Sequence, residues 1–78
     1  MLVFAYSALI GKRLRVSLST GRTFEGKLVK YDSVTNIVLA DAIEYLHSET
    51  SPEQLSGETR KLGAVIVIGR NISSVEEL

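Results

Sequence analysis

Few side chains in this sequence are of types that could carry out catalytic chemistry. It has one histidine, His47, and no cysteine, so neither a thiolate site nor a histidine-rich metal site can be assembled from it. The carboxylates Glu25, Asp41 and Glu44 are spaced as solvent-facing strand residues rather than as a buried acid–base pair, and no glycine-rich phosphate loop is present. We therefore expect no catalytic residue, no cofactor and no metal site, and a protein that is not itself an enzyme.

The charged residues argue against a surface that binds nucleic acid broadly. Nine basic and nine acidic residues give a net charge of zero, whereas proteins that bind phosphates over a whole surface usually carry a basic excess. The cluster Lys12, Arg13 and Arg15 could hold a phosphate, but such clusters more often form the solvent face of a helix end and a strand. This composition leaves room for local recognition of nucleic acid only.

The alternation of apolar and polar residues predicts one short helix followed by five strands in a single domain. The helix is expected over about residues 4–11, with Phe4 and Ala8 on one face and Gly11 after its end. Gly26, in the middle of the second strand, suggests a sharp bend or a close backbone approach. Five short antiparallel strands favour a small, strongly bent barrel of the mainly β class. The strands are expected over about 13–18, 23–31, 36–46, 62–68 and 72–76, with a tight turn at 69–71 and a loop over 48–59 that is rich in Ser, Glu, Thr and Gly.

The fourth expected strand, residues 62–68, is unusually apolar. It holds five large aliphatic side chains and no charge, so a free edge of this composition would aggregate unless something covered it. It could be an ordinary core strand covered by the rest of the domain, or a docking edge covered by another chain. We favour the docking edge.

Two segments resemble the paired motifs of the Sm-like (LSm) family. The first, within about 13–46, runs through Gly21-Arg22, Gly26, Tyr31-Asp32, Asn36, Leu39 and Glu44; the second, within about 60–76, runs from Leu62-Gly63 to Ile68-Gly69. Two linked motifs at matching spacing are far more specific than one short pattern. The resemblance implies a bent five-stranded barrel whose fourth strand pairs with the fifth strand of a neighbouring subunit, usually in a ring of six or seven. By this analogy the contact residues would be Lys61, Leu62, Ala64, Val65, Ile66, Val67, Ile68, Ile72 and Val75.

The same resemblance implies a pocket for one RNA base at the loops after the second and fourth strands. In RNA-binding members a flat side chain stacks on the base and an asparagine bonds its edge; Tyr31 and Asn36 match these positions, with Asp32 orienting the asparagine. Stacking combined with an amide is a common way to recognise single-stranded RNA. Alternatively, Asp32 and Asn36 only satisfy the backbone groups of a turn.

The other half of this RNA pocket is normally an arginine just before the glycine of the second motif. Ile68 stands there, followed by Gly69. Loss of the guanidinium removes a stacking partner worth on the order of 1–3 kcal/mol per base. Arg70 could substitute from the turn, since a strand residue and its second neighbour are only about 6–7 Å apart.

A second branch of the family also resembles this sequence. It includes the small auxiliary subunit of the N-terminal acetyltransferase C (NatC) complex, in which the pocket arginine is absent too. The similar segments are Thr59-Arg60 before Leu62-Gly63, the turn over 69–72, and the ending over 72–76. Two departures are Lys30-Tyr31-Asp32, which is more typical of RNA-binding members, and Ile68, where this branch often has proline. The branch implies a subunit that does not close a ring, but binds a large scaffolding subunit and with it supports a catalytic subunit.

We therefore predict a non-catalytic Sm-fold subunit, most similar to the NatC auxiliary subunit, with scaffolding and catalytic subunits as its partners. The alternative is an RNA-binding ring subunit that acts in RNA processing, splicing or decay, with other Sm-like subunits and U- or A-rich RNA as partners. Residues 1–11 are too short to span a membrane and lack the basic start of a secretory signal, so we expect a cytoplasmic protein, or a nuclear one under the alternative. The RNA-binding residues of the alternative would be Tyr31, Asp32, Asn36, Gly69 and Arg70.

Overall fold

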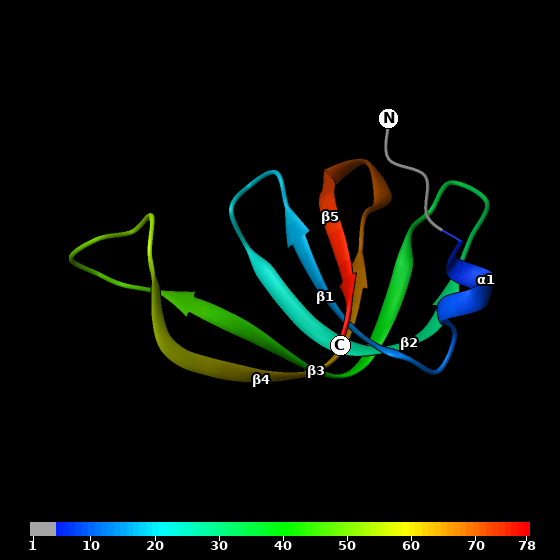
Figure 1. Cartoon of the computed structure of the whole chain (residues 1–78), viewed down its shortest axis with the longest axis horizontal. Helices are drawn as coiled ribbons and strands as arrows, with labels where there is room; N and C mark the ends of the chain where they lie inside the picture. The colour runs from blue at the N-terminus through cyan, green and yellow to red at the C-terminus, as the bar shows by residue number, and fades with distance from the viewer. Residues whose placement is uncertain (1–4) are drawn as a thin grey trace.

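One helical turn precedes a strongly bent, five-stranded antiparallel sheet in the computed structural model, which describes residues 5–78 (Figure 1). The strand order across the sheet is β4-β3-β2-β1-β5. This confirms the predicted fold class and the order of one helix followed by five strands. The elements are α1 (Tyr6–Leu9), β1 (Arg13–Leu18), β2 (Thr23–Tyr31), β3 (Ile37–His47), β4 (Leu55–Val67), the 3₁₀ turn η1 (Gly69–Asn71) and β5 (Ile72–Glu77).

The sheet bends around one apolar core. Alternate residues of β1, β2 and β3 point inward, so that their side chains meet inside the curl while their neighbours face outward. A Cβ at Gly26 would lie 2.9 Å from the Cβ of Leu39, which agrees with the predicted close approach of β2 and β3. The largest fully buried side chains are Leu14, Val16, Leu28, Ile37 and Leu39.

The strand β4, with 13 residues, is nearly twice as long as the sequence predicted. It begins at Leu55 rather than at Leu62, so the connection from β3 covers only residues 48–54 instead of 48–59. The first half of β4 bonds to β3, starting from His47 opposite Leu55, yet its side chains over 55–61 are all exposed. The polar composition of residues 55–61 therefore belongs to a strand that extends beyond the core, and not to a loop as the sequence predicted.

Only one turn of helix forms at the N-terminal end of the described chain. Tyr6 is its buried residue, whereas Ala8, which the sequence placed on the buried face, is exposed; Phe4 lies outside the described residues. The ring of Tyr6 lies 6.0 Å from that of Tyr31 between centroids, which joins α1 to the end of β2. Within residues 5–78, no helix is both long and apolar enough to cross a membrane.

Glu44 on β3 is buried, contrary to the expectation of a solvated carboxylate. Only 6% of it is exposed, and two arginines neutralise its charge. Arg22 donates to both carboxylate oxygens at 2.8 and 3.0 Å, and Arg60 donates to Oε1 at 2.6 Å. The bonds from Arg22, followed by those from Arg60, outweigh burial and lower the pKa of Glu44 to about 2. This cluster ties the outer half of β4 to β3 and to the start of β2.

Candidate interaction site at the loop end and the open edge

Asp32 and Asn36 form the centre of a hydrogen-bonded turn between β2 and β3. The Asp32 carboxylate accepts bonds from the backbone N–H groups of Val34 and Asn36, each at 3.0 Å, and from the Asn36 amide Nδ2, also at 3.0 Å. Burial alone would raise the pKa of Asp32, but these bonds together lower it. Asp32 thus orients Asn36 as the resemblance implied, and it also satisfies the turn backbone as the alternative proposed.

The other end of the Asn36 amide reaches across to the segment after β4. Its Oδ1 accepts a bond from the backbone N–H of Gly69 at 2.8 Å. The two segments approach so closely that a Cβ at Gly69 would lie 2.5 Å from the carbonyl oxygen of Thr35, so no larger residue fits. Both ends of the Asn36 amide are therefore engaged inside the chain.

A shallow hollow of about 320 Å³ opens beside this contact. Its lining residues are Val34, Asn36, Ile68 and Arg70. The structure therefore does bring Arg70 to the same hollow as Asn36, as the sequence allowed. However, the lining has no aromatic ring, and its most exposed apolar side chain is the aliphatic Val34.

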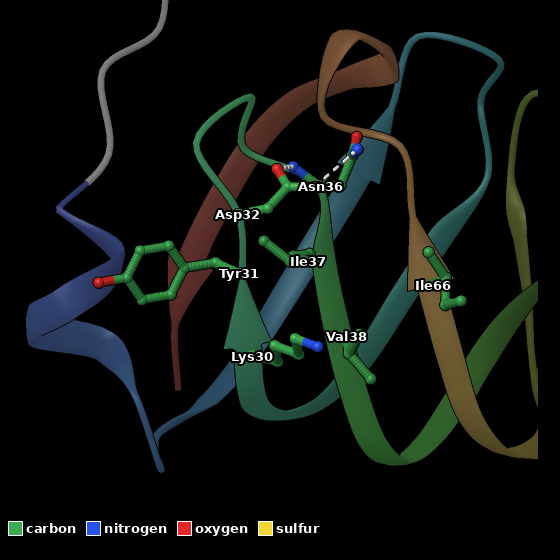
Figure 2. A pocket seen from close by; sticks show the side chains of 7 residues that line it. All are labelled: Lys30, Tyr31, Asp32, Asn36, Ile37, Val38 and Ile66. Carbon is green, nitrogen blue, oxygen red and sulfur yellow. Dashed lines mark hydrogen bonds between the residues drawn. The ribbon is translucent and has the colours of Figure 1, made fainter.

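Tyr31 lies elsewhere. Its ring points towards α1 and away from the Asn36 amide (Figure 2), and it does not line the hollow that Ile68 and Arg70 share. It meets Asn36 only along a smaller hollow of about 200 Å³ on the neighbouring surface. The arrangement expected from the resemblance, with Tyr31 and the position-68 side chain on either side of one base, is absent from this part of the chain.

The residues predicted as a protein interface lie along and behind the free edge of β4. Within residues 5–78, β4 pairs with β3 on one side and with no strand on the other, so the rest of the domain does not cover both of its sides. Ile66 is 72% exposed and Ile68 is 41% exposed, whereas Val67 between them is buried. The remaining predicted positions divide into exposed Lys61 and Ala64, and partly buried Leu62, Val65, Ile72 and Val75, which pack against the core.

Two residues of the basic cluster, Arg13 and Arg15, form ion pairs with residues of neighbouring strands. Arg13 pairs with Glu25 at 2.8 Å, and Arg15 pairs with Glu76 at 3.0 Å while also donating to the Tyr45 hydroxyl at 3.2 Å. These arginines therefore act as cross-strand links rather than as a phosphate site. No group of three or more candidate metal ligands occurs among residues 5–78.

The family model of the LSM domain matches residues 5–77, which is nearly the whole described chain. The chain belongs to the LSM domain family. Membership of this family, rather than anything missing from the structure, supports the prediction of a non-catalytic subunit. It also confirms the Sm-like resemblance of the two motifs.

Two curated LSM-domain relatives belong to different functional classes. The NatC auxiliary subunit N-alpha-acetyltransferase 38 of Danio rerio is 35% identical over 87% of this chain and 61% of its own length. The small nuclear ribonucleoprotein-associated protein B of Schizosaccharomyces pombe is 37% identical over 87% of this chain and 48% of its own length. The chain thus spans about half to three fifths of the length of these relatives.

Solved structures of the LSM fold divide in the same way. A heptameric archaeal Sm protein superposes with a TM-score of 0.76 and 26% identity, over 92% of this chain and 93% of the other. A chain in the crystal structure of the NatC complex bound to CoA superposes with a TM-score of 0.70 and 28% identity, over 96% and 86%. These matches establish the fold and leave both functional classes open.

Two features of the site were not visible in the sequence. The Glu44 cluster depends on Arg60, which lies in a segment of loop-like composition. Val34 lines the hollow from a turn in which the next residue, Thr35, has a positive φ of 61°. The polar run Asp32-Ser33 signals a turn, but it carries no signal for which side chain the turn presents.

Proposed function

We propose that this chain is a non-catalytic auxiliary subunit of a NatC-type N-terminal acetyltransferase complex. In this role it binds a large scaffolding subunit as a single copy and, with that subunit, supports a separate catalytic subunit. The relatives that motivate the proposal are the NatC auxiliary subunit of Danio rerio and the chain in the NatC complex structure. We place this role in the cytoplasm.

The observation that carries the proposal is the composition of the hollow at the loop end. A base held there would meet the aliphatic side chains of Val34 and Ile68, with Ile68 at the usual arginine position and no aromatic ring in the lining. Base stacking contributes about 1–3 kcal/mol per base, and branched aliphatic side chains lack the flat face that it needs. The Asn36 amide, bonded at both ends, has only one N–H and one lone pair left to offer.

The open edge of β4 supports a role in docking. A strand with unpaired backbone groups and exposed aliphatic side chains is a template for another chain, and soluble proteins normally cover such an edge. The hollow behind this edge has a volume of about 430 Å³ and includes Phe24, Leu62 and Val65 in its lining. A partner segment at the edge would bury the exposed parts of Leu62 and Val65.

An RNA-binding ring subunit is the second candidate, and one contact favours it. Arg70 and Asn36 line one hollow, so a guanidinium is available beside the amide although it comes from the turn. The relatives that support this role are the ribonucleoprotein-associated protein B and the heptameric archaeal Sm protein. Under this role β4 would pair with β5 of a neighbouring Sm-like subunit.

Co-expression separates the two roles. The chain would be produced with the scaffolding and catalytic NatC subunits of its own organism, and in parallel with that organism's Sm-like proteins. We expect a stable complex with the scaffolding subunit, and no retention of a U-rich RNA oligonucleotide. A closed assembly with Sm-like proteins that retains this RNA, together with no binding to the scaffolding subunit, would overturn the proposal.

A further inference from the structure

We propose that the outer face of β3 and its two neighbouring strands is a docking surface for an amphipathic helix with acidic flanks, carried by a partner protein. This surface, the outer patch, includes Ile66 and Lys61 of the edge strand β4 but extends across β3 to β2, and it shares no residue with the hollow lined by Val34, Asn36, Ile68 and Arg70. The inference rests on the proposed function in one respect: it takes the partner to be the scaffolding subunit. The outer patch consists of the aliphatic residues Val38, Ala40, Ile43 and Ile66 and the lysines Lys27, Lys30 and Lys61.

The sheet itself places these side chains together. Val38 lies between Ile37 and Leu39, which are fully buried, so its own side chain faces outward. Residues directly opposite one another in neighbouring strands share a face, and Figure 2 shows this for Lys30, Val38 and Ile66 on β2, β3 and β4. The opposite pairs are Lys30 with Val38, Lys27 with Ala40, Lys61 with Ile43, and Ile66 with Val38.

The outer patch is an aliphatic row with lysines on both sides. Val38, Ala40 and Ile43 follow one another along β3, with two of the lysines on β2 and the third on β4. A hollow of about 200 Å³ lies at the Val38 end, and another of about 440 Å³ at the Ile43 end. The two hollows leave room for large apolar side chains of a partner at either end of the row.

The three lysines of the outer patch form no ion pair within residues 5–78. Four arginines of the described chain form ion pairs with glutamates, but Lys27, Lys30 and Lys61 form none within residues 5–78. The nearby acidic residues are Glu25, opposite Ile43 on β2, whose charge is paired with Arg13; Asp41, at the bulge of β3; and Asp32, whose carboxylate already accepts three bonds in its turn. In a chain with zero net charge, three unpaired lysines around aliphatic side chains are complementary to carboxylates around an apolar stripe.

A helix fits this surface better than a strand does. The backbone of β3 is paired on both sides by β2 and β4, so no edge is free there for strand addition. From Val38 to Ile43 the row is about 16 Å long at about 3.3 Å per residue, which matches roughly three turns of a helix. Nucleic acid fits less well, because none of the seven residues of the outer patch is aromatic, and the Tyr31 ring at the Val38 end is turned towards Tyr6 of α1.

Charge reversal at Lys27 tests the inference in the complex with the scaffolding subunit. Lys27 lies on β2, away from the β4 edge, so docking at the edge alone would not involve it. We expect Lys27→Glu to weaken binding to the scaffolding subunit at least tenfold, and the double variant Lys27→Glu with Lys61→Glu to weaken it further. The affinity of the wild-type chain for the scaffolding subunit should fall as the salt concentration rises. Lys12→Glu is the matched control, since Lys12 is also an exposed, unpaired lysine but lies before β1, outside the outer patch.

The outcomes separate the two proposals. If the wild type binds the scaffolding subunit and Lys27→Glu binds it equally well, the docking surface is wrong but the proposed function stands. If the wild type does not bind the scaffolding subunit, both the proposed function and this inference are overturned. Loss of binding to a U-rich RNA oligonucleotide in Lys27→Glu would identify the outer patch as a phosphate surface and would also overturn the inference. Carboxylate-to-lysine cross-linking gives a second readout: we expect links from the three lysines to one helix of the scaffolding subunit. Melting temperatures equal to that of the wild type show that the variants remain folded.

Discussion

The loop end and the β3–β4 side of the sheet use their side chains in opposite ways. At the loop end, Asp32 and Asn36 match a binding motif, yet the Asp32 carboxylate accepts three bonds and the Asn36 amide is bonded at both ends, all within the chain. On β4 and directly after it the sequence looks like core, yet Ile66 and Ile68 are exposed, and among residues 5–78 one backbone edge of β4 is open. Residues that look functional thus stabilise the fold, and residues that look structural are free to bind.

This contrast has a physical origin. A polar side chain that is already bonded inside the chain has fewer groups left to offer a ligand, whereas exposed aliphatic side chains and unpaired backbone groups gain from being covered. The contrast fails if the bonds at the loop end are dispensable for folding, or if the open side of the sheet can be made polar without losing a partner.

The largest expected effect comes from two neighbouring residues of β4. Val67 is 2% exposed and Ile66 is 72% exposed. Val67→Asp should cost about 4 kcal/mol, close to the whole stability of so small a chain, because it buries an unpaired charge. Ile66→Asp should change stability by less than about 0.5 kcal/mol but prevent scaffold binding. Urea unfolding with a binding assay measures both, and equal stability losses in the two variants would show that the outer face of β4 is not free.

The next largest effect concerns the buried carboxylate that holds the outer half of β4. Because the pKa of Glu44 is lowered from 4.5 to about 2, its stabilising effect is full above about pH 4.5 and is lost as the pH falls towards 2. Glu44→Gln should therefore lower the free energy of unfolding by about 3 kcal/mol at pH 7, and the difference from the wild type should shrink towards pH 2. Denaturant unfolding across this pH range measures it, and a difference that does not depend on pH would contradict the role of the ion pairs.

Asn36→Ala should cost about 2 kcal/mol, because it removes two hydrogen bonds and leaves the Gly69 N–H without its acceptor. Arg70→Ala is the matched control from the same hollow and should leave stability unchanged, since none of the hydrogen bonds between side chains of the described chain involves Arg70. Thermal unfolding of both variants tests this difference. If Asn36→Ala were as stable as the wild type, the amide would be free for a ligand.

The smallest effect is a gain of function. Ile68→Arg restores the guanidinium of RNA-binding family members, and we expect it to raise affinity for U-rich RNA by about tenfold from a very weak baseline, while the lack of an aromatic ring in the hollow keeps binding weak. Ile68→Lys supplies the charge without the flat group and should gain less. Fluorescence anisotropy with labelled RNA makes the comparison. Tight binding of U-rich RNA by the wild-type chain would show that the loop end is a binding site, and would contradict the difference drawn between it and the β3–β4 side of the sheet.

Much of the fold could be predicted because local patterns agree with it. Alternation along β1 and β2, the close approach at Gly26, the turn at 69–71 and the short last strand all follow from spacing and turn chemistry. The first half of β4 could not be predicted, because burial is what makes a strand recognisable and residues 55–61 are exposed. Its pairing with β3 is a long-range property of the folded chain.

The site was harder to predict than the fold. The turn contacts of Asp32 and Asn36 are local, so their sequence spacing was informative. The direction of Tyr31 was not, because the register of β2 against β3 shifts between Leu28 and Lys30, and such a shift changes the face on which the following side chains lie. Glu44 looked solvated because its partners are far away in sequence.

The most direct test of the central claim is the mass of the assembly that the chain forms. Native mass spectrometry would be applied to the complex purified after co-expression with the scaffolding and catalytic subunits, and to the chain alone. We predict one copy of the chain per scaffolding subunit, and no closed ring for the chain alone. A six- or seven-membered ring of Sm-like subunits that retains bound RNA would contradict a docking role for the open side of the sheet.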